Sequence, residues 1–175
     1  MPTLLLLRHA KSSWKTGGRR DFERSLAPRG QRAAALMGGF LAEHDLMPDL
    51  VLCSAAVRAK TTLDLALPHF AGKPEIRYLE ELYLTGPRKM LALLRSLEAA
   101  PDRILLIGHN PGFHALSLLL SGTGAEDELS AMAAKFPTAA LAVIDFPGPW
   151  ADIAASTGHL RLFATPRLIA QNSAP

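Results

Sequence analysis

Short apolar runs alternate with longer segments of helical periodicity along this chain. Each run ends at polar residues, which is typical of a strand that is buried on both faces of a sheet. The longer segments repeat their apolar residues at intervals of three or four, which predicts amphipathic helices. In the first of these, the spacing places Leu36, Met37 and Leu41 on the buried face. The predicted strands are residues 3–7, 50–53, 75–79, 103–107, 139–146 and 160–164, and the predicted helices are residues 27–43, 55–70, 87–97 and 112–120.

Strands that alternate with helices indicate an α/β domain, with a mainly parallel sheet covered by helices on both faces. We therefore expect one three-layer α/β/α sandwich over residues 1–175, in which the last strand is antiparallel. The tail from about residue 166 lacks such a pattern and is expected to be mobile. Residues 122–135 form the one long segment without clear periodicity and are a candidate lid or insert, with a helical turn or two in 126–134.

Composition and charge narrow the class of protein. Hydrophobic residues make up 49% and charged residues 20% of the chain, as in an ordinary globular protein. A net charge of +3, with no long run of like charges, predicts no nucleic-acid partner. The single cysteine, Cys53, excludes a disulfide framework and a cysteine-rich zinc site. The first apolar run ends at Arg8 and no stretch reaches the ~18 residues of a membrane span, so we expect no membrane partner and a cytoplasmic location.

Reactive side chains stand where three predicted strands end. Arg8 and His9 follow the first strand, Arg58 follows the second, and His109 follows the fourth. Because ligands of open α/β sheets bind beyond the carboxyl ends of the strands, we expect these side chains to meet at one edge. Arginine binds phosphate in a bidentate manner, and the first amides of a helix favour an anion. The sequence therefore predicts a phosphate site.

A histidine in such a site suits a reaction at phosphorus. A neutral imidazole attacks through a nitrogen lone pair, and nearby guanidinium groups lower the histidine pKa and so favour the neutral form. We identify His9 as the candidate nucleophile of a phosphatase, with Arg8 and Arg58 binding the transferred group. Once the phosphate dianion is present, His109 is expected to be stabilised as a cation that binds the developing charge.

Three sequence blocks carry a resemblance to a known family. The segment Leu7-Arg8-His9-Ala10 resembles R-H-[GA], residues 54–62 (SAAVRAKTT) resemble S-x-x-x-R-[AC]-x-x-T, and residues 108–111 (GHNP) resemble G-H-x-P. These are motifs of the histidine phosphatase, or phosphoglycerate mutase-like, superfamily. The blocks RHAKSSW, DFERSLAPRG, GHNP and KFPT are similar to the short SixA-type phosphohistidine phosphatases. The resemblance spans residues 3–164, almost the whole chain.

The resemblance implies a phosphoglycerate mutase-like fold and a covalent phosphohistidine intermediate on His9. It also implies that Arg8, Arg58 and His109 bind the phosphoryl group, and that neither a metal nor another cofactor takes part. The substrate that it favours is a phosphorylated protein carrying phosphohistidine. A broad-specificity phosphomonoesterase acting on small phosphorylated metabolites is the alternative.

Two further residues take their expected roles from the same resemblance. Arg24 matches another arginine of the family pocket, and Glu81 falls where the superfamily carries its proton donor. An acid matters for alkyl esters, whose alkoxide is a poor leaving group, and less for phosphohistidine. Whether Glu81 or His109 donates the proton is left open at this point.

Other classes of phosphate-handling protein fit the sequence less well. A cysteine phosphatase needs Cys-x5-Arg, but only four residues separate Cys53 from Arg58. Metallophosphatases need carboxylate and histidine clusters, and His109 and His114 do not form the H-E-x-x-H pattern. A phosphate-recognition module without catalysis needs arginines but no nucleophile such as His9.

Overall fold

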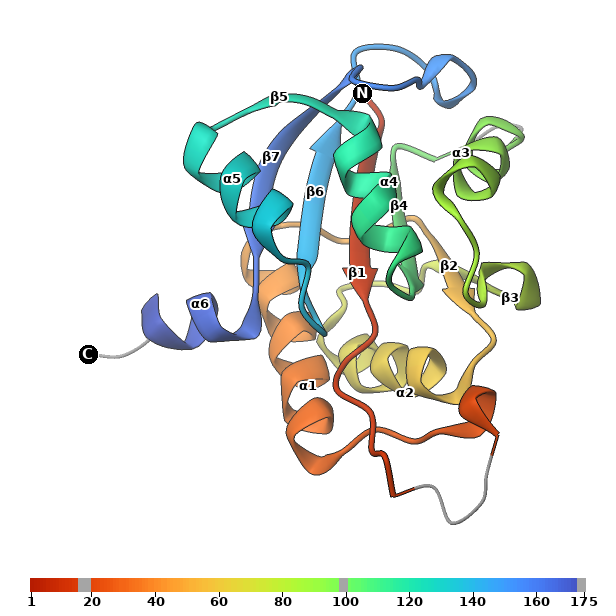
Figure 1. The fold of residues 1–175 in the computed structure, drawn as a ribbon, viewed down its shortest axis with the longest axis vertical. Coiled ribbons are helices and arrows are strands. Elements are labelled where there is room, and N and C mark those ends of the chain that lie inside the picture. Colours follow the sequence, from red (N-terminus) through yellow and green to blue (C-terminus); the bar gives the residue numbers. More distant parts are fainter. Residues whose placement is uncertain (16–19, 98–100, 173–175) are drawn as a thin grey trace.

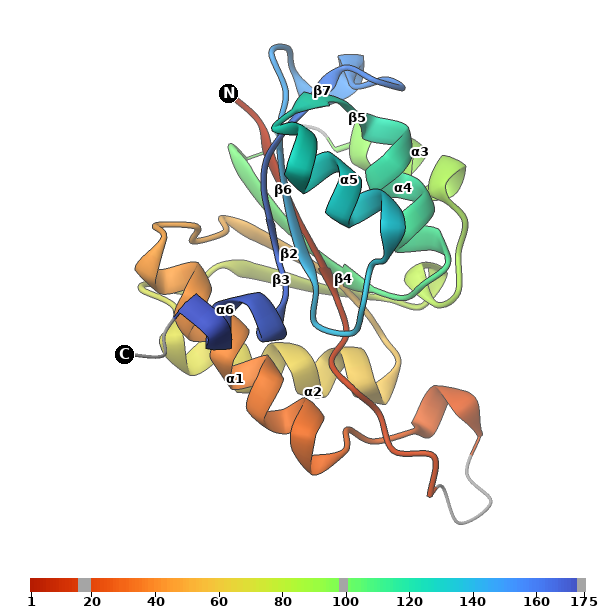
Figure 2. The same cartoon turned by 60° about the vertical axis from the view of Figure 1, so that its left-hand side comes forward.

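The fold is a seven-stranded sheet with helices on both faces (Figures 1 and 2). It is seen in a computed structural model, which describes residues 1–15, 20–97 and 101–172. The strand order is β3-β2-β4-β1-β6-β7-β5, and the arrangement confirms the predicted α/β fold. The strands are β1 (Thr3–Arg8), β2 (Leu50–Ser54), β3 (Glu75–Leu79), β4 (Arg103–Gly108), β5 (Ser121–Gly124), β6 (Leu141–Asp145) and β7 (Gly158–Ala164).

The sheet is mainly parallel, as predicted, and β6 is the strand that runs opposite to the others. β1, β2, β3 and β4 form a parallel block, whereas β6 pairs with both β1 and β7 in antiparallel ladders. The last strand, β7, is thus antiparallel to its neighbour β6 but runs in the direction of β1. The chain enters β6 from the carboxyl edge of β1, where the carbonyl of Ala140 accepts a hydrogen bond from the N–H of Arg8 at 3.0 Å. Strand β6 must therefore run back along β1, in the opposite direction.

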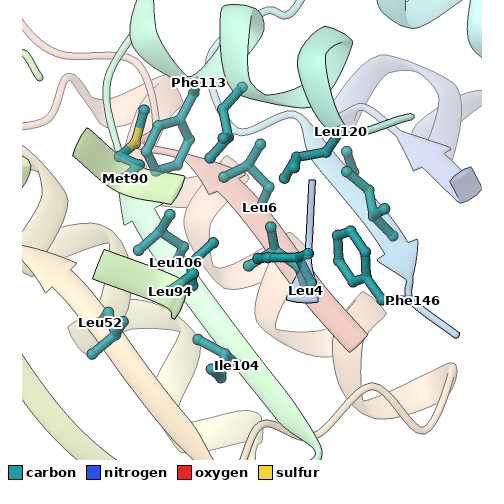
Figure 3. Packing of buried hydrophobic residues seen from close by; sticks show 14 of the residues in the cluster. Leu4, Leu6, Leu52, Met90, Leu94, Ile104, Leu106, Phe113, Leu120 and Phe146 are labelled. Carbon is teal, nitrogen blue, oxygen red and sulfur yellow. The ribbon is translucent and has the colours of Figure 1, made fainter. Parts of the chain in front are cut away.

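Strand β1 lies inside the sheet and is buried on both faces. Leu4 and Leu6 belong to one hydrophobic core, and Leu5 and Leu7 to the other, since side chains alternate along a strand. This is why the strand is a continuous apolar run and not an alternating one. Figure 3 shows the first core, which includes Leu4, Leu6 and Phe113 of the covering helix α4.

The helices form the two outer layers of the predicted three-layer sandwich. α1 and α2 cover one face of the sheet, and α3, α4 and α5 cover the other (Figures 1 and 2). Within the described residues, four short 3-10 helices lie in the connections. The helices are α1 (Pro28–Glu43), α2 (Val57–Ala66), α3 (Pro87–Arg95), α4 (Gly112–Leu120), α5 (Glu126–Ala134) and α6 (Pro166–Asn172), and the 3-10 helices are η1 (Asp21–Glu23), η2 (Leu67–His69), η3 (Glu80–Leu82) and η4 (Trp150–Asp152).

Helix α1 buries a slightly different face from the predicted one. Met37 and Leu41 are buried as expected, but Leu36 is 38% exposed. The neighbouring helix α2 decides the rotation, because its backbone packs directly on Gly38. A Cβ at Gly38 would lie only 2.7 Å from the backbone of Ala66. The close helix contact therefore turns Leu36 outwards.

Two segments without clear periodicity have regular structure. Residues 122–135 lie in β5 and α5, and Met132 of α5 is buried in the core. None of these residues lines the cavity that Arg8, His9, Arg58 and His109 form at the carboxyl edge of the sheet, so the segment is an insert in the sheet and not a lid. The tail that was expected to be mobile begins with helix α6, because Ile169 packs against the core near α1. Residues 173–175 of that tail lie outside the described ranges. No helix in those ranges is both long enough and apolar enough to cross a membrane.

Candidate active site

The structure brings Arg8, His9, Arg58 and His109 together at the carboxyl edge of the sheet, as the sequence predicts. Arg8 ends β1 and His9 follows it, Arg58 lies in the first turn of α2, and His109 follows β4. All four line one cavity of about 330 Å³. The other lining residues are Lys11, Ser12, Trp14, Asp21, Arg24, Leu84, Asn110 and Thr138.

The imidazole of His9 has a defined tautomer. Its Nδ1 lies 2.7 Å from the carbonyl oxygen of Ala10. Because a carbonyl oxygen only accepts, Nδ1 carries the proton and Nε2 holds the lone pair in the neutral ring. Nε2 accepts a hydrogen bond from Nε of Arg58 at 3.3 Å. Burial is the main cause that lowers the pKa of His9 to about 3, and the charges of His109 and Arg58 act in the same direction. The ring is therefore neutral at neutral pH.

His109 lies beside His9, with 5.0 Å between the ring centroids. Its Nε2 is 2.7 Å from Oγ of Ser54, the last residue of β2. Burial, followed by the charge of Arg58, lowers the pKa of His109 to about 3. Its Nδ1 is buried without a hydrogen-bond partner among the described residues. An unpaired buried polar atom costs about 1–3 kcal/mol, and such atoms are concentrated at functional sites.

Asp21 joins the arginines of the cavity. Its carboxylate accepts hydrogen bonds from Arg58 Nη2 at 3.1 Å and from Arg24 Nη1 at 2.8 Å. Its backbone carbonyl accepts another from Arg58 Nη1 at 2.6 Å, and the hydroxyl of Tyr83 donates to the carboxylate at 2.5 Å. The Tyr83 hydroxyl is the largest cause that holds the pKa of Asp21 well below its usual range, and both arginines add to it. Asp21 is therefore ionised at neutral pH.

Arg24 lines the cavity, as predicted, but its guanidinium group already makes hydrogen bonds and a ring contact within the protein. Nη2 donates to Oγ of Ser12 at 2.5 Å, and Nε donates to the carbonyl of Ser13 at 3.2 Å. The indole of Trp14 lies over the same group, 3.7 Å from Cζ to the ring centroid. Arg24 is 8% exposed. Its contacts hold the loop after β1 and the carboxylate of Asp21 in place.

Arg8 and Asn110 are held by one shared acceptor. The carbonyl of Phe136 accepts from Arg8 Nη1 at 2.9 Å and from Asn110 Nδ2 at 2.8 Å. This contact explains why the KFPT block belongs to the site. Burial, and then the charge of Arg58, lowers the pKa of Arg8, as expected for two cations held near each other. A bound anion relieves such repulsion.

The structure does not bring Glu81 into this cavity, which corrects its predicted place. Leu82 of η3 is 2% exposed and anchors the short helix in the core. Glu81, on one side of that anchor, is exposed and lines a separate hollow together with Lys89 of α3. On the other side, the ring of Tyr83 meets His109 edge-on, with 5.4 Å between centroids. The anchored leucine thus decides which neighbour reaches the site.

The described residues do not form the site of a cysteine phosphatase or of a metallophosphatase. Cys53 is fully buried, and burial raises the pKa of its thiol to about 12, so the reactive thiolate is suppressed. Among the described residues, no group of three or more His, Cys, Asp or Glu side chains is placed to hold a metal ion.

The sequence did not predict the parts that Asp21, Thr62 and Tyr83 play in the site. Asp21 lies in the DFER block that also contains Arg24, so that block carried a signal for it. Thr62 ends the second sequence block, and its Oγ1 accepts from the N–H of Ala10 at 3.0 Å and donates to the carbonyl of Arg58 at 2.7 Å. No pattern in the sequence marks Tyr83.

Comparisons with known proteins bear on this site. The model of the histidine phosphatase superfamily (branch 1) matches residues 4–83. The solved structure of a proposed phosphohistidine phosphatase SixA from Nakamurella multipartitia is 32% identical, with a TM-score of 0.81 over 94% of this chain and 96% of that one. The chain belongs to the histidine phosphatase superfamily. A second proposed SixA, from Agrobacterium tumefaciens, is also 32% identical to this chain, with a TM-score of 0.78 over 95% and 99% of the two chains.

The chain also has relatives of similar length. An uncharacterised protein of Mycobacterium leprae is 34% identical over 165 residues, which cover 92% of this chain and all of the relative. The superfamily match includes Arg8, His9, Arg24 and Arg58. The same side chains are those that the fold gathers around the cavity.

Proposed function

We propose that this protein is a phosphatase that hydrolyses phosphohistidine or phosphomonoester groups through a covalent intermediate on Nε2 of His9. One observation carries the proposal. The Ala10 carbonyl fixes the proton of His9 on Nδ1, so the lone pair of Nε2 lies beside Arg58 in the cavity. That is the arrangement of a nucleophile next to a phosphate-binding cation.

The first step transfers the phosphoryl group to the enzyme. Nε2 of His9 attacks phosphorus and forms a P–N bond, while the bond to the leaving group breaks and its electron pair leaves with that group. Arg8, Arg58 and His109 stabilise the charge on the three non-bridging oxygens. As the dianion binds, it raises the pKa of His109 and makes the imidazolium a better partner for the phosphate.

The second step returns the enzyme to its starting state. Water attacks the phosphohistidine on the side opposite His9, the P–N bond breaks, and its electron pair returns to Nε2. Inorganic phosphate leaves. The chemistry needs no metal in this proposal, because the arginines supply the positive charge that a metal ion supplies in other phosphatases.

The cavity favours substrates whose leaving group needs little help from an acid. Asp21 is the one carboxyl residue in its described lining, and its lowered pKa leaves it without a proton to donate. Alkyl esters release a strongly basic alkoxide and depend on an acid, whereas an imidazole leaves already protonated. We therefore propose phosphohistidine on a cytoplasmic phosphoprotein as the substrate, with His109 as the proton donor for a leaving group that needs one.

The decisive experiment compares three proteins on a generic aryl phosphate in excess EDTA. The wild-type protein is expected to be active, His9→Ala inactive, and the control His159→Ala, at an exposed position on β7, fully active. Arg8→Lys and Arg58→Lys should weaken binding of inorganic phosphate and slow turnover together, since Arg forks bind phosphate better than Lys does. Near wild-type turnover by a folded His9→Ala protein would overturn the proposal.

The substrate is tested with a panel of equal concentrations of phosphohistidine peptide, phosphoserine peptide and a sugar phosphate. We expect the highest kcat/KM on phosphohistidine. Comparable values on all three would assign the protein to the broad-specificity phosphomonoesterases instead, with the same nucleophile.

A further inference from the structure

A second hollow lies directly beside the catalytic cavity. It has a volume of about 360 Å³, and it shares Lys11 and Thr138 with the cavity. Three more cations line it: Arg29 from the first turn of α1, Lys135 from the KFPT block, and Arg167 from α6. We call this the basic hollow.

The cations of the basic hollow have no acidic partner in the part of the chain that the structure describes. None of the four takes part in the ion pairs found there, which use other arginines and the amino group of Met1. No Asp or Glu is among the residues that line the hollow. Four positive side chains from separate segments thus face one space that offers them no carboxylate. Such a surface attracts an anion from outside the chain.

We infer that the basic hollow binds carboxylate side chains of an acidic protein segment whose phosphorylated residue occupies the catalytic cavity. The inference rests on the proposed function and extends it to the choice of phosphoprotein. Lys11 and Thr138 line both spaces, so the two spaces are neighbours and one polypeptide segment can reach both.

The exposure of the cations favours a protein segment over a compact second phosphate. A small-molecule site uses buried, pre-positioned polar groups, as the catalytic cavity does with Arg58 at 3% exposure. In the basic hollow, Arg29, Lys135 and Arg167 are exposed, whereas the guanidinium of Arg58 is held by hydrogen bonds to Asp21. Long flexible cations at a surface suit several carboxylates in varied positions on a protein.

Exposed charges act mainly on encounter and binding, so the basic hollow should change KM and the salt dependence more than kcat. The variant is the double substitution Arg29→Gln and Arg167→Gln, which leaves every residue of the catalytic cavity in place. The matched control is Lys73→Gln with Arg88→Gln, two exposed cations that line neither space.

The substrates are two phosphohistidine peptides that differ only in having four Glu or four Gln residues beside the phosphorylated position. We expect the wild-type protein to prefer the Glu peptide by about tenfold in kcat/KM, through KM, and to lose that preference at high salt. The double variant should lose the preference and keep wild-type activity on an aryl phosphate. The control variant should behave as wild type in every assay.

Three outcomes would overturn the inference. The first is that the double variant keeps the preference for the Glu peptide. An equal loss on both peptides would show a general effect on structure. A loss confined to a compact bisphosphate, such as 1,4-butanediol bisphosphate, would make the hollow a small-molecule subsite.

If neither peptide is hydrolysed although aryl phosphate is, the peptides are compared as inhibitors of that reaction. Stronger inhibition by the Glu peptide, lost in the double variant, supports the basic hollow while the phosphohistidine assignment fails.

Discussion

The carboxylate of Asp21 lies 3.1 Å from Nη2 of Arg58, and the backbone carbonyl of Asp21 lies 2.6 Å from Nη1 of the same side chain. Arg58 is thus held through two of its nitrogens, and its third, Nε, points to Nε2 of His9 at 3.3 Å. A guanidinium anchored in this way cannot rotate freely, so its position relative to the nucleophile is set before the substrate arrives. This pre-positioning is what an electrostatic catalyst requires.

Asp21 should make the stability of the protein depend on acid. Its folded pKa lies below the value of about 3.9 in an unfolded chain, so its contribution is fully present above pH 4 and is lost as the pH falls towards the folded pKa. We expect Asp21→Asn to unfold at lower urea concentration than wild type at pH 7, with a gap that narrows steadily below pH 4. Asp152→Asn, at an exposed position of η4, is the control. A gap of constant size from pH 7 to pH 2 would contradict the prediction.

His9 should affect stability in a higher pH range. Its pKa is about 3 in the folded protein and about 6.5 in an unfolded chain, so the unfolded state binds more protons between these values. Stability is therefore fully present above pH 6.5 and falls as the pH is lowered towards 3. We expect His9→Asn to reduce the slope of unfolding free energy against pH, between pH 6 and pH 4, by about 1 kcal/mol per pH unit. Urea titrations measure this slope, and an unchanged slope would mean that His9 is protonated in the folded state.

Glu81 should not be needed for catalysis. Because its side chain is exposed and lines a different hollow, Glu81→Gln is expected to change kcat/KM by no more than about twofold on an alkyl phosphate, an aryl phosphate and a phosphohistidine peptide. Glu80→Gln serves as the neighbouring control. General acid catalysis contributes about a hundredfold or more. A loss of that size confined to the alkyl phosphate would restore Glu81 as the proton donor.

Two glycines of α1 should respond in opposite ways to substitution by alanine. A Cβ at Gly30 would lie 2.0 Å from the carbonyl oxygen of Lys11, whereas at Gly39 the nearest atom, Nδ1 of His69, is 3.8 Å away. We expect Gly30→Ala to lose about 1–3 kcal/mol and Gly39→Ala to gain about 0.5–1 kcal/mol of unfolding free energy.

Gly30→Ala should also lower activity, because Lys11 follows the residue whose carbonyl holds His9. Urea unfolding and aryl phosphate hydrolysis on both variants test this pair. Equal stability of the two proteins would show that the loop after β1 moves away from α1 at no cost.

The candidate site was predictable as far as it depends on where strands end. Arg8, His9, Arg58 and His109 each stand at the end of a strand or the start of the following helix. Parallel strands present their carboxyl ends at one edge of the sheet, so these residues meet there independently of the conformation of the connecting loops. Asp21 and Tyr83 belong to the connections. Their positions depend on the packing of η1 and η3, which no local pattern reports.

The α/β class, the order of the six strands and four helices with clear periodicity, and the four central side chains follow from the amino-acid pattern, because burial on both faces leaves a clear apolar run in the central strands. Tertiary structure alone decided that Leu82 directs Tyr83 and not Glu81 to the site, and that Gly38 turns Leu36 outwards. It also decided that Lys11, Arg29, Lys135 and Arg167 share one hollow. These outcomes depend on contacts between segments far apart in the chain, and such contacts are formed only when the layers pack.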